Sequence, residues 1–178
     1  MKRLSALLAI PLVAAALTAG AAPAGAAAVD GTCVASIVLN FSPPATEPLP
    51  PSIGPLTTAT GAGTITTCVF PGGGATTGTF SYTLTGNLTC TAAQNIAGTL
   101  NITWSDGTQT TATVTTLVPT LGSAGGAAGL SATITSGRFD GDQVTIANLR
   151  DPLALITCLT TGLATATGIT SLTFTQPI

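Results

Sequence analysis

The chain has 178 residues, with four basic residues, six acidic residues and no histidine. Hydrophobic residues make up 45% of the chain and charged residues only 6%. With so few positive charges there is almost nothing to neutralise a phosphate backbone or an anionic lipid surface, which excludes nucleic acid binding and electrostatic membrane binding.

The N-terminal segment has the pattern of a secretory signal peptide. Lys2 and Arg3 form a positive region, an apolar run follows over Leu4–Ala19, and small residues come after it. The apolar run is shorter than the roughly 20 residues that span a bilayer, which favours a cleaved signal over a membrane anchor. We predict a helical signal peptide over residues 1–28, cleaved near residues 26–28.

The exported domain, residues 29–178, is predicted to be acidic and to fold as one unit. It keeps two basic residues against six acidic ones, a net charge of −4. A chain of this length can bury a single core. We expect a secreted, extracellular protein, with association with the cell wall as an alternative.

Four cysteines lie in this domain: Cys33, Cys68, Cys90 and Cys158. An even number in an exported chain indicates two disulfides. A zinc site is the alternative, but no two cysteines have zinc-knuckle spacing and no histidine can complete a site. If the first two strands run antiparallel, Cys33 lies beside Cys68, and Cys90 then meets Cys158 on a late strand. Four cysteines allow three pairings, and this is the one we predict.

Apolar residues alternate with Thr or Ser through most of the domain, which predicts β-strands. The first strand is expected over Cys33–Phe41 and the second over Thr58–Phe70. The Pro-rich connection between them, Ser42–Pro55, is excluded from strand interior because proline cannot donate to the ladder. The inward-facing residues of the later strands are predicted to be Phe80, Tyr82 and Leu84; Leu100, Ile102 and Trp104; Ala112 and Val114; Ala132 and Ile134; Val144 and Ile146; and Leu172 and Phe174.

Gly-rich segments separate these runs and predict turns or loops at Pro71–Gly74, Asp106–Gly107, Gly122–Gly129 and Asp140–Asp142. No segment of the domain shows the periodicity of an amphipathic helix, so we expect eight or nine strands and no helix. The fold class is therefore all-β. An antiparallel two-sheet sandwich of the immunoglobulin-like type is favoured, and a small barrel is the alternative.

The side chains available for chemistry are few. The domain has no histidine and no lysine, and its cysteines are assigned to bridges, so activated nucleophiles are excluded. The remaining carboxylates, such as Asp106, Asp140 and Asp142, sit beside glycines, which is typical of turns. A calcium loop at Asp140–Asp142 is the alternative, but such loops offer more acids. We predict that the protein is not an enzyme and assign no catalytic residue, cofactor or metal.

Three further features have alternative interpretations. Trp104 is in phase with Leu100 and Ile102, which favours a core position over an exposed sugar-binding platform. Outward Thr residues indicate an ordinary solvent-facing sheet, since no fixed-period repeat supports an ice-binding array. The Pro-rich connection is interpreted as a rigid crossover, with recognition of a protease or another extracellular protein as the alternative.

A resemblance rests on four segments: the Ala-rich N-terminal segment, Thr79–Cys90, Ile102–Gly107 and Ser136–Gly141. They resemble a group of small secreted actinobacterial proteins without assigned function, and this resemblance implies no catalytic or binding residues. A more distant similarity to neocarzinostatin-type apoproteins, which are secreted β-sandwiches with two disulfides, implies small-molecule binding as one expectation.

The predicted function is therefore that of a secreted, disulfide-stabilised, non-catalytic protein with a structural or binding role in the extracellular space or cell envelope. The first alternative is a carrier of a small apolar ligand, with a cavity near Trp104 and Tyr82. The second is a protease inhibitor or adhesin that acts through the Pro-rich connection.

Overall fold

The structure is a computed structural model that describes residues 28–47, 54–74, 76–90, 93–120, 127–150 and 152–177. Nearly all of the predicted signal peptide and the middle of the Pro-rich connection lie outside these residues. Eight strands and one helix form the fold: β1 (Val29–Ala45), β2 (Leu56–Val69), β3 (Gly78–Leu88), β4 (Ala93–Trp104), β5 (Gln109–Thr120), β6 (Ala127–Gly137), β7 (Gln143–Arg150), α1 (Pro152–Thr161) and β8 (Leu163–Thr175).

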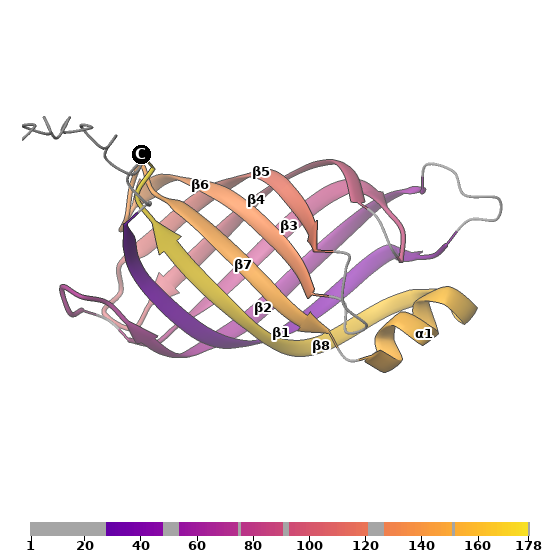
Figure 1. Cartoon of the computed structure of the whole chain (residues 1–178), viewed down its shortest axis with the longest axis horizontal. Coiled ribbons are helices and arrows are strands. Elements are labelled where there is room, and N and C mark those ends of the chain that lie inside the picture. The colour runs from indigo at the N-terminus through magenta and orange to yellow at the C-terminus, as the bar shows by residue number, and fades with distance from the viewer. Residues whose placement is uncertain are drawn as a thin grey trace, which may run out of the picture.

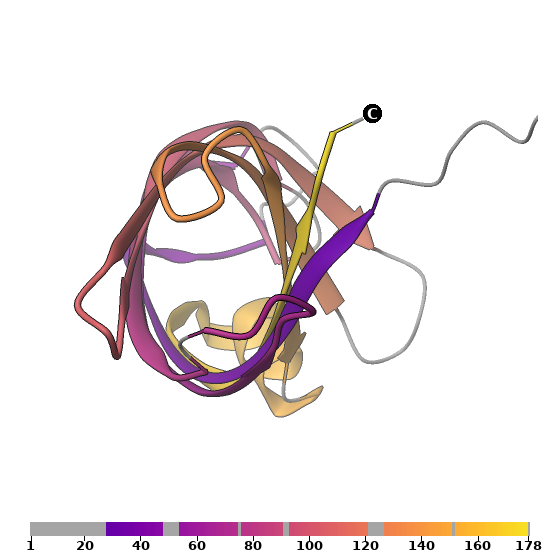
Figure 2. The same ribbon diagram turned by 90° about the vertical axis from the view of Figure 1, so that its left-hand side faces the viewer.

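The strands form one closed antiparallel barrel. Each strand pairs with the next one in the sequence, and β8 returns to pair with β1. Figure 1 shows the tilted strands from the side, and Figure 2 looks along the barrel and shows the ring that they form. The predicted all-β class and antiparallel pairing are confirmed, and the barrel forms rather than the sandwich. Closure gives every strand two neighbours, whereas a two-sheet sandwich has edge strands with one.

β1 is longer than predicted and includes Pro43 and Pro44, so the exclusion of the whole Ser42–Pro55 segment from strands was wrong. The ladder explains why these prolines are tolerated. The last β1 residue paired with β2 is Ser42, and pairing with β8 shifts register between Asn40 and Ala45. Both prolines therefore lie in an irregular stretch where no regular partner needs their missing N–H groups.

The expectation of a helix-free domain was also wrong, because α1 forms between β7 and β8. Cys158 lies on this helix and not on a late strand. Pro152 at the first helical position and Gly162 after the last one, at a φ of 85°, are favourable helix boundaries. Apolar residues occur on more than one side of the helix, so no single apolar stripe marked it in the sequence.

The core fills the interior of the barrel, and the predicted inward-facing residues are buried. We name the two ends of the barrel by what closes them. The aromatic end is where β2, β4, β6 and β8 finish. The helix end is the opposite one, where α1 and the end of β1 lie (Figure 1). Within the described residues, no helix has both the length and the apolar character needed to cross a membrane.

Candidate functional site

Four aromatic rings close the aromatic end. Phe70, Trp104, Phe139 and Phe174 come from four different parts of the chain, and their centroids lie between 4.8 and 6.1 Å apart. Trp104 is buried, as predicted, and its indole N–H donates to the Thr110 hydroxyl over 2.9 Å. Such mutual edge and tilted contacts stabilise aromatic clusters beyond the area they bury. The barrel is therefore sealed here by side chains.

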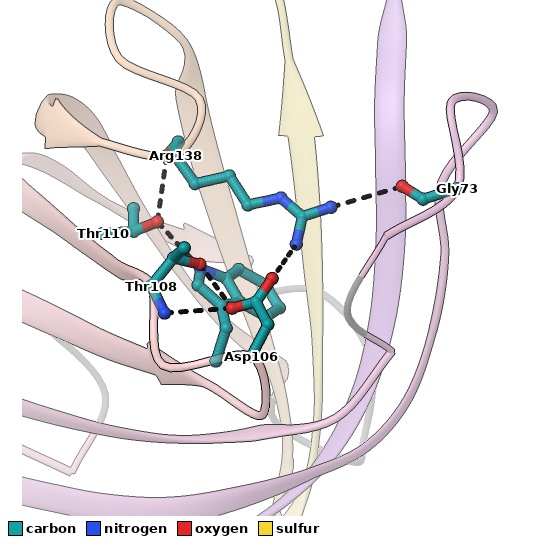
Figure 3. A network of polar contacts seen from close by, with 6 residues as sticks. Gly73, Asp106, Thr108, Thr110 and Arg138 are labelled. Atoms are coloured by element: carbon teal, nitrogen blue, oxygen red, sulfur yellow. Dashed lines mark hydrogen bonds and ion pairs between the residues drawn. The ribbon is translucent and has the colours of Figure 1, made fainter.

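Arg138 lies over this cluster. Its guanidinium carbon is 4.9 Å from the ring centre of Phe70, 5.3 Å from that of Trp104 and 5.1 Å from that of Phe139. One guanidinium N–H donates to the Gly73 carbonyl in the β2–β3 connection, as Figure 3 shows. A planar cation suits such stacking. Arg138 thus ties the loops of this end to the core below them.

Asp106 completes the network from the β4–β5 turn. Its carboxylate accepts hydrogen bonds from the hydroxyl and the backbone N–H of Thr108, and it lies 3.7 Å from the Arg138 guanidinium (Figure 3). The Thr108 hydrogen bonds, followed by the charge of Arg138, hold the pKa of Asp106 below its ordinary value. The local Asp–Thr bonds are those of an ordinary turn. Asp106 is thus engaged as a turn residue and ion-pair partner.

A shallow depression of about 520 Å³ lies beside this network. Gly74, Asp106, Thr108, Gln109, Gly137 and Arg138 line it. The depression is open to solvent on one side, and its one cation is already paired with Asp106. We assign no ligand to it, because the polar groups around it already satisfy one another.

A pair of carboxylates, Asp30 and Asp142, also lies at the aromatic end. Burial, and after it a hydrogen bond to Asp30 and the charge of Asp30, raises the pKa of Asp142 to about 6. Two carboxylates in contact favour sharing one proton over both being ionised. Asp142 does not line the depression beside Arg138, and we assign no chemistry to this pair.

The predicted Asp140–Asp142 turn joins β6 to β7. Gly141 has a φ of 92° and Phe139 a φ of 68°. The Gly141 N–H donates to the Ile134 carbonyl, and the Asp142 N–H donates to the Phe139 carbonyl. The segment is a hairpin turn, as interpreted from the sequence. Among the described residues, no group of three or more metal-ligating side chains comes together.

The inward side chains of β1 and β3 become slightly more exposed toward the helix end. Along β1, the exposed fraction of inward side chains rises from 1% at Ala35 to 6% at Leu39, and along β3 it rises from 3% at Phe80 to 7% at Leu88. At the aromatic end, by contrast, Phe174 is fully buried although it lies next to the last residue of its strand. On these strands the inward side chains are thus slightly more exposed toward the helix end, although all of those named remain buried.

Two aromatic rings of β3, Phe80 and Tyr82, line the interior of the barrel. Tyr82 and Phe80 stack at 6.5 Å with an interplanar angle of 17°. Their rings lie against Gly61 and Gly63 on the neighbouring strand β2, where even a methyl group would collide with them. The absence of side chains at Gly61 and Gly63 thus makes room for these two rings against the barrel wall.

The helix α1 lies at the helix end of the barrel. Ala154 and Cys158 face the barrel and pack with Ala45 and Leu163, and the Cys158–Cys90 disulfide ties the helix to the segment after β3. The other bridge joins Cys33 to Cys68, which are direct partners in the β1–β2 ladder. This is the pairing that the strand layout predicts.

The residues on which the two alternative functions depend lie in different parts of the protein. The structure separates the two residues near which a cavity was expected. Trp104 belongs to the aromatic cluster, whereas Tyr82 stacks on Phe80 further along the barrel interior. The centre of the Pro-rich connection lies outside the described residues. Sequence reasoning missed Arg138 as an organising residue; the signal available was an Arg-Phe pair at a turn in a domain with only one other basic residue.

Fold and bridges together define the class of the molecule as an eight-stranded, up-and-down antiparallel β-barrel with two disulfides. Comparisons with family models, with curated proteins and with solved structures returned no match to this chain.

Proposed function

We propose that the protein is a secreted, non-catalytic binding protein whose barrel takes a small apolar ligand in the half nearest the helix end. The observation that carries the proposal is the slight rise in exposure of the buried inward side chains of β1 and β3 toward that end, beside an aromatic end closed by four packed rings. An eight-stranded barrel is just wide enough either to be filled by side chains or to hold one small ligand.

The lining indicates the class of ligand. The inward side chains of this half include Leu39, Ala59, Tyr82, Leu84 and Val114, which offer hydrocarbon and one stacked aromatic surface. The buried hydroxyls of Thr57 and Thr170 already donate to backbone carbonyls. A ligand without charge and with few polar groups matches such a wall, because any unpaired polar group buried there would be costly.

The non-catalytic part of the proposal rests on the side chains present. The exported domain has neither histidine nor lysine, and all four cysteines are in bridges. Secretion is supported by the N-terminal sequence pattern and by disulfides, which persist in oxidising compartments. A reaction abolished by Asp140→Asn or Asp142→Asn would contradict the non-catalytic assignment.

Native mass spectrometry of the protein from its own culture supernatant tests binding. We expect an additional mass that organic solvent extracts, and saturable binding of the neutral fluorophore N-phenyl-1-naphthylamine to the extracted protein. Ala59→Phe should weaken binding of this probe roughly tenfold by filling the interior. The matched control, Ala62→Phe on the outer face of the same strand, should leave it unchanged. Empty spectra and no saturable probe binding by folded protein would overturn the proposal.

A further inference from the structure

The outer face of α1 exposes three large aliphatic side chains. Leu153 is 65% exposed, Ile156 57% and Leu159 51%, and they follow one another at intervals of three residues. This spacing places them on one broad side of the helix. Ala154 and Cys158 face the barrel, whereas these three aliphatic side chains face solvent. We call Leu153, Ile156 and Leu159 the helix patch.

The threonine hydroxyls of α1 are satisfied within the helix. The hydroxyl of Thr157 donates to the Leu153 carbonyl, that of Thr160 to the Ile156 carbonyl, and that of Thr161 to the Thr157 carbonyl. These bonds withdraw the hydroxyl donors from solvent. No residue from Pro152 to Thr161 is charged. The side chains of the helix therefore present a surface that can leave water without stranding a hydroxyl donor or a charge.

The charges of the molecule gather at the other end. Of the charged side chains that the structure describes, Asp30, Asp106, Arg138, Asp140 and Asp142 belong to the aromatic end, and only Glu47 follows β1 at the helix end. In the sequence, Arg150 and Asp151 precede the helix with opposite charges. The charged side chains that the structure describes thus lie mostly at the aromatic end, and α1 itself carries no charge.

The size of the helix patch distinguishes between possible occupants. Three aliphatic side chains of this size expose together no more than roughly 300 Å². A stable protein interface needs about 800 Å² from each partner, so a second copy is not held by this patch alone. A lipid surface has no such requirement, because a few aliphatic side chains can enter it individually. The acidic net charge of the exported domain favours a neutral surface over an anionic one.

We infer that α1 is a docking element that inserts the helix patch into an electrically neutral lipid surface and brings the helix end of the barrel to that surface. This inference goes beyond the proposed function, since docking requires no ligand in the barrel. It agrees with the exclusion of electrostatic membrane binding, because the attraction is apolar. If both hold, an apolar ligand would pass between barrel and lipid at this end.

Flotation of the whole protein with phosphatidylcholine vesicles tests the inference. We expect binding that depends little on salt and does not increase when phosphatidylglycerol is added. Changing the helix patch to Gln (Leu153→Gln, Ile156→Gln and Leu159→Gln) should weaken partitioning at least roughly tenfold, and Gln keeps the helix propensity high. The matched control changes three exposed aliphatic residues of the barrel wall, Val34→Thr, Val38→Thr and Ile169→Thr, and should change partitioning less than about twofold.

A second variant tests the inference even if the Gln triple variant does not fold. Leu159→Trp places an indole in the helix patch, while the single native tryptophan, Trp104, is buried at the aromatic end. Brominated phosphatidylcholine should quench the fluorescence of the Leu159→Trp protein and leave that of the parent unchanged. Absence of vesicle binding, equal losses in the helix and wall variants, or no quenching of the introduced indole would each overturn the inference. A parent protein that is dimeric in solution and made monomeric by the Gln variant would do so too. Since ligand occupancy is measured separately by native mass spectrometry, failure here leaves the proposed function standing.

Discussion

Removing the Cys90–Cys158 disulfide tests whether this bridge holds α1 in place. It closes a segment of 68 residues, for which chain entropy gives about 4.4 kcal/mol of stabilisation. The Cys33–Cys68 bridge closes 35 residues and gives about 3.8 kcal/mol. Replacing both members of either pair with Ala should therefore lower Tm by similar amounts, about 8–16 °C in a domain of this size. Ala is chosen because all four positions are buried and a hydroxyl would lack a partner.

The two variants should differ in where protection is lost. Cys33 and Cys68 join strands that remain paired along the rest of their ladder, whereas α1 is anchored chiefly through Cys158 and Ala154. Hydrogen exchange of the Cys90/Cys158 variant should rise at least roughly tenfold in Leu153–Thr161 and little in the β1–β2 pairs. The Cys33/Cys68 variant should leave α1 protected. A folded Cys90/Cys158 variant with unchanged helix protection would refute the assigned role of the bridge.

Two further predictions concern the aromatic end. Arg138→Gln should lower the free energy of unfolding by about 1–2 kcal/mol, because the cation that contacts three rings is lost. Arg138→Lys should recover less than half of this loss. Urea unfolding measures both variants, and unchanged stability of the Gln variant would contradict the role of Arg138. Because the pKa of Asp142 is raised from 3.8 to about 6, the folded protein holds this proton more tightly than the unfolded chain. Its contribution to stability is full below about pH 4 and is lost as the pH rises through about 6. Asp142→Asn should therefore stabilise the protein at pH 8, by up to about 1 kcal/mol after solvent screening, and change little at pH 4; a pH-independent effect would contradict this.

Strand positions could be predicted because one local rule governs them. Phe80, Tyr82 and Leu84 alternate with Thr and Ser, and the face they define is the inner wall of the barrel. The same alternation would serve either a sandwich or a barrel, since both bury one face of each strand. What decides between them is the pairing of β8 with β1, a contact between the two ends of the domain that leaves no local mark in either strand.

The helix and the Arg138 network could not be predicted for related reasons. In α1, Leu153, Ile156 and Leu159 face solvent, so the sequence shows apolar residues where a soluble amphipathic helix would have polar ones. Arg138 gains its partners only when the turns after β4 and β6 and the loop after β2 meet at one end of the barrel. Neither feature is encoded by spacing within one segment.

The two disulfides act on ends of opposite character. At the aromatic end, Cys33–Cys68 reinforces strands that ring packing already closes, so this bridge adds stability where the structure is rigid. At the helix end, Cys90–Cys158 holds a helix whose Leu153, Ile156 and Leu159 side chains stay largely exposed, while Ala154 and Cys158 pack on the barrel. The disulfide can hold these side chains at the surface, because hydrophobic burial alone would favour turning them toward the barrel. The position of this bridge therefore supports a role for the helix patch at the protein surface. Reduction of Cys90–Cys158 should weaken vesicle binding before it unfolds the barrel.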